Sequence, residues 1–317
     1  MSSTEEPSDS QIQELVDGLF VPERSADYHE RLKIVGNRAV SFLVAALNDP
    51  HIRTTVFDSP IPQGSPDLAW PLYRIGELLA TSGSEAAAVH FSDYLTNEDQ
   101  RFREYAAWGL GSIALESCVE PVSRILAGED RELRTSAMTG IRRALAAGGG
   151  GRAFFKAIRA SVEDLLDVDY GGYYELLVDV ELEEGTDALS PPERNYFAAS
   201  LYYYEICNGG PWQYFGNSTA DYHGMIVAGL RAIDAPRTAQ TLEDAGKVFG
   251  PEGPPKDREA RYEMMDTFSD QQEKNIDELY SPEKNIDNSR FPSGEDIEML
   301  LFLYVVEHRA EFREYPS

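Results

Sequence analysis

Residues 208–217, with the sequence NGGPWQYFGN, are the stretch around which the chain is organised. Gly209 and Gly210 can adopt the left-handed backbone that ends a helix, and Pro211 suits the first turn of the helix that follows. Large aromatic side chains lie before and within the stretch, and they favour burial at a helix joint. These aromatic residues are Tyr202, Tyr203, Tyr204, Trp212, Tyr214 and Phe215. The stretch therefore predicts a tight joint between two helices.

Helical patterns extend from this joint in both directions. Residues 190–193, with the sequence SPPE, predict the start of the helix that leads into the joint, because the serine can cap it and the glutamate can reach back. Beyond the joint, apolar spacing predicts further helices. The expected ranges are 225–233, 236–248, 258–280 and 294–312. No alternating strand pattern stands out, so we expect an all-α protein.

Upstream of the joint, a segment recurs after 31 residues. FREYAAWGL at 102–110 is followed by LRTSAMTGI at 133–141, each copy preceded by an acidic turn, with a short amphipathic helix between them. The shared D-x-x-[LF]-R-x-x-A core resembles HEAT repeats, particularly the short bacterial HEAT-like kind. That resemblance implies helix pairs that bury their apolar faces by stacking, so we expect a HEAT-like α-solenoid over residues 11–160. Earlier copies are expected around 36–48 and 68–97.

The net charge of −27, from 55 acidic and 28 basic residues, is unevenly distributed. Residues 1–160 carry 22 acidic and 16 basic residues, whereas residues 161–317 carry 33 and 12. Direct binding of nucleic acid is not expected, because that binding depends on Lys and Arg. An acidic surface should instead attract a basic protein. A salt-adapted or acid-biased proteome would give the same totals, and composition leaves both explanations open.

The densest acidic segment lies between Ala160 and Glu193, which contains no Lys or Arg. Aliphatic residues persist among its carboxylates, so we expect a helical connecting segment at 161–189 with an acidic outer face. These carboxylates are the candidate binding surface. They are Glu163, Asp164, Asp167, Asp169, Glu175, Asp179, Glu181, Glu183, Glu184 and Asp187.

Other features bear on location rather than on chemistry. Residues 1–10 are rich in Ser, Glu and Pro, so we expect disorder there, and no export signal is visible. Cys118 and Cys207 lie far apart in apolar helical patterns, which indicates reduced structural thiols. No run approaches the length of about 18 apolar residues that a membrane span needs. We expect a cytoplasmic protein without a membrane anchor.

No catalytic, cofactor-binding or metal-ligating residue stands out. The five histidines are scattered, and neither H-E-x-x-H nor a nucleophile motif occurs. His223, near Asp221 and the joint, is the most site-like of them, but a satisfied or exposed histidine is favoured over a catalytic one. An enzyme with a pocket near His223 is therefore the least favoured alternative.

The second half contains four short motifs, at 208–217, 229–235, 245–250 and 277–280. Their order resembles the C-terminal-type domain of a bacterial DNA-mimic protein family, over residues of about 190–315. Pro211-Trp212 and Asp234 depart from the family pattern. The resemblance implies an acidic helical domain whose carboxylates imitate DNA phosphates and occupy the DNA-binding face of a basic protein. The joint residues that carry it are interpreted as structural: Asn208, Gly209, Gly210, Gln213, Tyr214, Phe215 and Asn217.

The function expected from sequence is thus a non-enzymatic, acidic protein-binding module, with DNA mimicry as the leading hypothesis and no cofactor. Its partner would be a basic protein such as a DNA-binding regulator. The alternative is an immunity-type protein that neutralises a basic toxin such as a nuclease.

Overall fold

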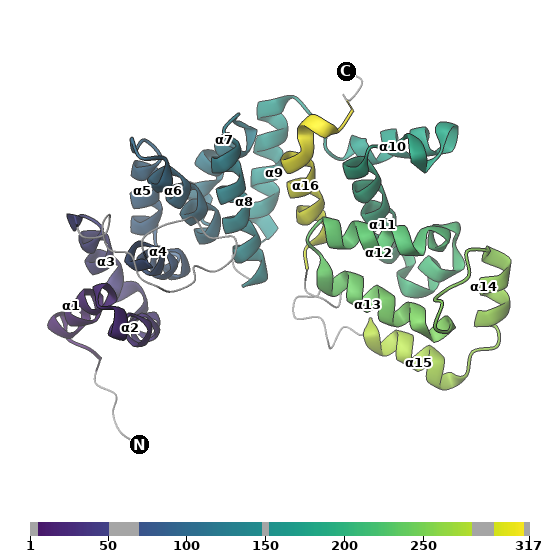
Figure 1. The fold of residues 1–317 in the computed structure, drawn as a ribbon, viewed down its shortest axis with the longest axis horizontal. Coiled ribbons are helices and arrows are strands. Elements are labelled where there is room, and N and C mark those ends of the chain that lie inside the picture. Colours follow the sequence, from purple (N-terminus) through teal and green to yellow (C-terminus); the bar gives the residue numbers. More distant parts are fainter. Residues whose placement is uncertain (1–5, 51–69, 148–151, 281–294, 314–317) are drawn as a thin grey trace. The chain divides into compact units, whose positions relative to one another are not determined.

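The computed structural model describes residues 6–50, 70–147, 152–280 and 295–313 (Figure 1). Within these ranges the regular structure is helical and no strand occurs, which confirms the all-α class. The chain forms two compact units, Met1–Leu166 and Asp167–Ser317. The acidic segment 161–189 is not a unit of its own, since its first six residues complete a helix of the first unit and the rest belongs to the second. In none of the described residues is a helix both long and apolar enough to cross a membrane.

The first unit begins with α1, whose N-cap Ser8 forms a capping box with Gln11. The helix starts at Asp9, so Asp9 and Ser10 are helical, contrary to the expected disorder of 1–10, and residues 1–5 lie outside the described part. The helices of this unit are α1 (Asp9–Asp17), α2 (Pro22–Val35), α3 (Val40–Ala46), α4 (Trp70–Ser82), α5 (Glu85–Tyr94), α6 (Gln100–Ile113), α7 (Val119–Ala127), α8 (Arg131–Ala146) and α9 (Arg152–Leu166).

Alternate helices of this unit pack on one another. α4 packs on α6 and α6 on α8, while α3 packs on α5 and α7 on α9. The acidic turns that recur in the sequence supply helix caps, because Asp99 and Asp130 accept hydrogen bonds from the first-turn amides of α6 and α8. This order of contacts suits stacked helix pairs, while the assignment to HEAT-like repeats stays a prediction.

The small residues of the repeated segments allow α6 and α8 to approach closely. A Cβ on Gly140 would collide with the carbonyl oxygen of Trp108, and one on Gly111 would collide with that of Ala137. The two glycines come from different helices and face the other helix's backbone. Glycine is therefore required on both sides of the most extensive helix contact in the unit.

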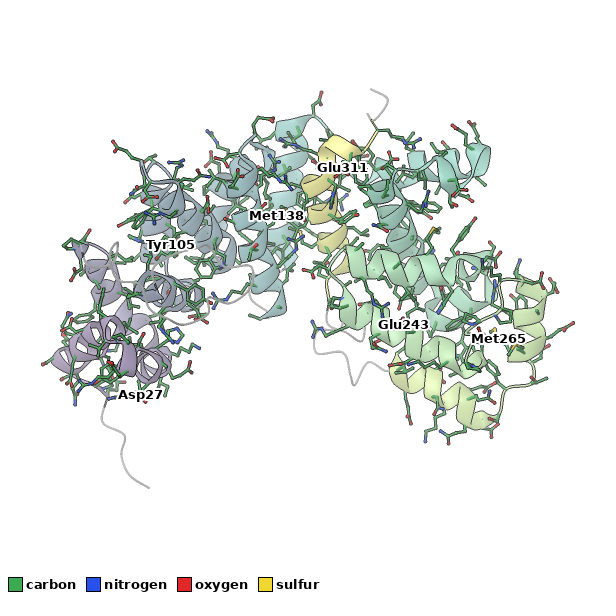
Figure 2. All side chains as sticks on the ribbon, in the orientation of Figure 1. Asp27, Tyr105, Met138, Glu243, Met265 and Glu311 are labelled. Carbon is green, nitrogen blue, oxygen red and sulfur yellow. The ribbon has the colours of Figure 1, made fainter. Side chains whose placement is uncertain are left out.

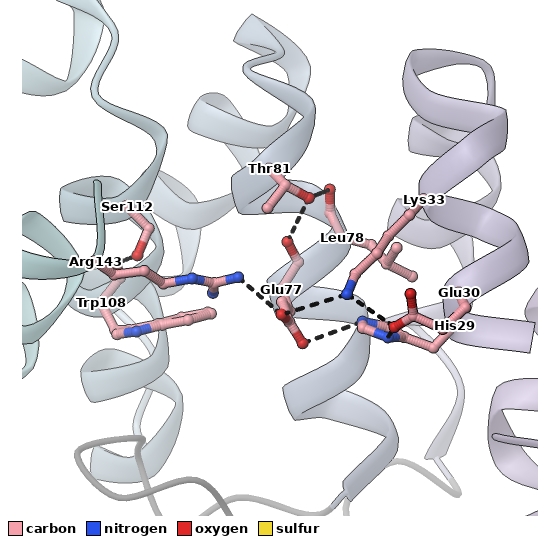
Figure 3. Close-up of polar contacts among 9 residues, drawn as sticks. All are labelled: His29, Glu30, Lys33, Glu77, Leu78, Thr81, Trp108, Ser112 and Arg143. Atoms are coloured by element: carbon pink, nitrogen blue, oxygen red, sulfur yellow. Dashed lines mark hydrogen bonds and ion pairs between the residues drawn. The ribbon is translucent and has the colours of Figure 1, made fainter. Parts of the chain in front are cut away.

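A polar cluster joins three helices of the first unit through Glu77 of α4 (Figure 3). Its carboxylate lies 3.1 Å from Nε2 of the buried His29 on α2 and accepts a hydrogen bond of 3.0 Å from Arg143 on α8. The Arg143 guanidinium also lies over the Trp108 ring, 5.1 Å from its centroid. Burial opposes ionisation of Glu77, but His29, Arg143 and Lys33 outweigh it and lower the pKa of Glu77. His29 is thus part of a structural network.

The second unit is arranged around α11, which contacts α10, α12, α14 and α16. The single helix expected over 258–280 is wrong, because the chain breaks at 266–269 and Ser269 caps a separate helix. The closing helix α16 is buried along most of its length. The helices of the unit are α10 (Gly172–Glu184), α11 (Pro191–Gly216), α12 (His223–Ala232), α13 (Pro236–Gly246), α14 (Arg258–Met265), α15 (Asp270–Leu279) and α16 (Ile297–His308).

Candidate functional site

The joint in α11 depends on the backbone of Gly210. Its φ of +77° and ψ of −164° interrupt the helix, and this region of backbone space is accessible almost only to glycine. Pro211 then opens the short second part of the helix, which ends at Gly216. The break that the sequence predicts is therefore present at Gly210, with Pro211 in the first turn that follows it.

Two amide side chains of the joint bind one carboxylate that lies upstream of the break. Glu205 accepts hydrogen bonds from Nε2 of Gln213 at 2.8 Å and from Nδ2 of Asn217 at 3.0 and 3.1 Å. The Thr219 hydroxyl donates a further bond at 2.8 Å. These contacts tie the residues after the break to the part of α11 before it. Sequence analysis missed Glu205, although two amides four residues apart on a helix point toward a shared partner.

The aromatic residues of the joint have two different environments. Tyr214 and Phe215 are fully buried, as expected, and the Tyr214 hydroxyl lies 3.1 Å from Nδ1 of His223. Trp212 is only half-buried, and its indole nitrogen donates a hydrogen bond of 2.9 Å to Asp277 on α15. Asn208 is exposed. The rings of the joint therefore form core packing on one side and a surface contact with α15 on the other.

A buried arginine fastens α14 to the joint. Arg261 is inaccessible to solvent and donates hydrogen bonds to the carbonyl oxygens of Phe215 and Asn217, at 2.9 and 2.6 Å. Its guanidinium also binds the carbonyls of Pro255 and Lys256, and it lies 2.7 Å from a carboxylate oxygen of Asp221. Carbonyl groups that a helix end leaves without helical donors are satisfied in this way. Sequence analysis did not identify Arg261.

The ring of His223 lies beside the rings of Tyr214 and Phe215. Burial lowers its pKa to about 4, so the imidazole is neutral at pH 7. Asp221, the neighbouring carboxylate in the sequence, forms an ion pair with Arg261. Among the residues that the structure describes, no group of His, Cys, Asp and Glu side chains is placed to hold a metal ion.

The ten candidate carboxylates are divided between the two units. Glu163 and Asp164 belong to α9 in the first unit, and the other eight belong to the second. Four of the ten have partners within their own unit. Glu163 binds Arg159, Asp169 accepts from the Gly171 amide, Glu181 accepts from the Tyr222 hydroxyl, and Asp187 lies near Arg194.

Three of the remaining carboxylates form a stripe along α10. Glu175, Asp179 and Glu183 are exposed and follow one another at intervals of four residues, about 6 Å along the helix axis. No partner for them occurs among the described residues. We call these three residues the α10 stripe.

A second acidic surface occurs on α14 and α15, where basic residues are interspersed among the carboxylates. Side chains project outward from both helices, and Met265 marks the end of α14 (Figure 2). We call this set the α14–α15 arm. It consists of the exposed carboxylates Glu259, Glu263, Asp266, Asp270 and Glu273. Asp277 and Glu278 of α15 are exposed as well, but they contact Trp212 and Lys274.

Comparison with known proteins agrees with this acidic helical domain. Residues 187–308 match the sequence model of the family described as DMP19-like protein, which supports the DNA-mimic type of domain expected from the joint and its neighbouring motifs. The match covers less than half of the chain, includes α11 to α16 and begins after α10. No curated protein and no solved structure gives a significant match.

Proposed function

We propose that the second unit is a non-enzymatic protein-binding module that presents helix-borne carboxylates to a basic partner, in the manner of a DNA mimic. The observation that carries the proposal is the DMP19-like match over the residues that build and fasten the α14–α15 arm. The family match is the basis for the proposed type of function. The contacts within this chain are the basis for proposing the α14–α15 arm as the binding surface.

The charge of the second unit suits this role. Residues 167–317 contain 31 acidic and 12 basic residues, a net of −19. Nucleic-acid-binding proteins present Lys and Arg to phosphates, and carboxylates can take the place of those phosphates in charge-assisted hydrogen bonds. A surface of this charge repels DNA itself and speeds the encounter with a cationic protein.

Rigidity also supports the proposal. Arg261 holds α14 through four carbonyl oxygens and one carboxylate, and Trp212 holds α15 through Asp277. Charges on fixed helices lose little conformational freedom on binding, so more of the interaction energy remains as affinity. The arm is therefore suited to displaying carboxylates in a constant arrangement.

The test is affinity capture from the source cell with the full chain at low and high salt. We expect a basic protein to be retained at low salt and released either by salt or by added duplex DNA, because DNA and the arm compete for the same cations. A DNA-binding regulator and a nuclease toxin would both behave in this way, and identifying the captured protein separates them. Absence of any basic protein at low salt would overturn the proposal.

A matched pair of variants locates the binding surface. The first carries Glu259→Gln, Glu263→Gln, Asp266→Asn and Glu273→Gln on the arm. The second neutralises as many exposed carboxylates of the first unit, Glu14→Gln, Glu98→Gln, Glu116→Gln and Glu132→Gln. We expect the arm variant to lose roughly tenfold in affinity for the captured protein and the control to change little. Equal losses would show that only net charge matters and would contradict a defined surface.

A further inference from the structure

We propose that the outward face of α10 is a separate docking surface, and that it binds a basic amphipathic helix of a partner protein. The proposal rests on the proposed function for the class of partner, a basic protein, and adds the surface and the shape of the segment bound. α10 precedes the residues that match the DMP19-like family. This surface is therefore additional to the matched domain.

α10 is firmly held on its inner side. Leu177 is fully buried, and the Tyr173 ring packs edge-on against Phe312 with ring centroids 5.6 Å apart. Tyr174 packs against Tyr204 of α11 with centroids 4.5 Å apart. Near the end of the helix, Glu181 accepts a hydrogen bond of 2.5 Å from the Tyr222 hydroxyl. These contacts fix which face of α10 points outward.

The outward face combines charge with aliphatic surface. The α10 stripe runs along its middle, and Leu182 beside it is 74% exposed. Half-buried aliphatic residues flank the stripe on both sides, namely Leu176, Val178 and Val180. A helix that faces only water usually carries polar residues over its whole outer side. On α10, aliphatic residues also occur on the outer side of the helix. This face can therefore make apolar contacts and ionic contacts with the same partner.

The chemistry of the face defines its occupant. Carboxylates spaced by one helical turn match Lys or Arg spaced four residues apart on a second helix, and Leu182 with its neighbours matches aliphatic residues beside those cations. A DNA strand carries one phosphate per about 3.4 Å of axis, whereas the stripe carries one carboxylate per about 6 Å. The stripe thus differs from DNA both in charge density and in its aliphatic flanks, and it suits a helix better than a phosphate-binding groove.

The experiment uses the full chain and a synthetic helical peptide that carries Arg at intervals of four residues with Leu beside them. Two comparison peptides replace either the Leu residues by Ser or the Arg residues by Gln. Calorimetric titration should show roughly tenfold weaker binding without Arg and roughly fivefold weaker binding without Leu. Equal binding of the Leu and Ser peptides would overturn the proposal, because only charge would then be recognised.

Variants of the chain place the peptide on α10. Glu175→Gln with Asp179→Asn and Glu183→Gln should weaken binding roughly tenfold, and Leu182→Ser roughly fivefold. The matched control, Glu259→Gln with Glu263→Gln and Glu273→Gln on the α14–α15 arm, should stay within roughly twofold. The opposite pattern would assign the peptide to the arm and overturn the proposal for α10. In that outcome the proposed function would still stand.

Two further measurements exclude occupants from the chain itself. Leu182→Cys, made with Cys207→Ser, should react with an alkylating reagent nearly as fast as a free thiol, whereas slow reaction would show that the chain covers this face. Sedimentation should give the same mass for the parent and for Leu182→Ser. A dimer that Leu182→Ser dissociates would show that a second copy is the occupant, and it would overturn the proposal of a basic partner.

Discussion

At the scale of single residues, Gly210 is a position where a side chain would strain the backbone without colliding with any other atom. A Cβ at this position would meet no atom within 4 Å, so only the backbone conformation opposes a side chain there. We expect Gly210→Ala to destabilise the second unit by about 1–3 kcal/mol. Gly224→Ala, on the exposed helical backbone of α12 and also without neighbours, should instead stabilise by up to about 1 kcal/mol. Native-state hydrogen exchange of α11 and α12 measures both, and effects of the same sign would contradict the argument.

Glu193 gives a residue-scale prediction about pH. Burial raises the pKa of this carboxyl, but Arg313 and the Ser190 amide outweigh burial and lower it to about 2, against an ordinary 4.5. A depressed pKa in the folded state contributes stability above pH 4.5 that is lost as the pH falls toward 2. By linkage the contribution is of the order of 3 kcal/mol.

Glu193→Gln should therefore be much less stable than the parent at pH 7, and the difference should shrink between pH 4.5 and 2. Glu183→Gln, at an exposed position of α10, serves as the control and should follow the parent at every pH. Acid titration of stability, followed by hydrogen exchange in α11, makes the comparison. A difference that stays constant over that pH range would mean that Glu193 is not held ionised by Arg313.

At the scale of elements, Arg261 decides whether α14 stays in place. It is the only buried residue of α14, so the helix depends on the guanidinium more than on apolar packing. Arg261→Lys keeps the charge but cannot span four carbonyls and a carboxylate. We expect a loss of about 2–4 kcal/mol and faster hydrogen exchange in α14 and residues 210–222. Arg231→Lys, in an exposed ion pair with Glu243, should change stability by less than about 1 kcal/mol. Similar effects of both substitutions would contradict the special role of Arg261.

The same elements show how far sequence can predict this fold. The break at Gly210 and the capped start at Ser190 are local, because glycine, proline and capping residues act on their own backbone. The break at 266–269 was missed, since the apolar spacing continues across it and a single Ser269 cap is a weak signal. Arg261 and Glu205 were missed, because partners such as Phe215, 46 residues from Arg261, and Asn217, 12 residues from Glu205, come together only in the folded chain. The carboxylates of α10 were identified from composition, but which of them face outward required the structure.

At the scale of the whole molecule, the charge is distributed unequally between the units. Residues 1–166 carry 24 acidic and 16 basic residues, a net of −8, and residues 167–317 carry a net of −19. Adaptation of an entire protein to salt would be expected to acidify both units. The imbalance is consistent with a role confined to the second unit, because self-repulsion there opposes folding and would need a compensating use.

This imbalance predicts that salt stabilises the two units to different degrees. The Debye length falls from about 30 Å at 0.01 M salt to about 10 Å at 0.1 M, so repulsion among the carboxylates of the second unit should be screened over that range.

Native-state hydrogen exchange of the intact chain resolves both units in one sample. Protection should rise more with KCl in α11 to α15 than in α4 to α8, whereas sucrose, which carries no charge, should raise both alike. The Glu77 cluster of the first unit should lose stability slightly as its ion pairs are screened. An equal response of the two units to KCl would mean that local ion pairs dominate over net charge, and the acidity of the second unit would then need no functional explanation.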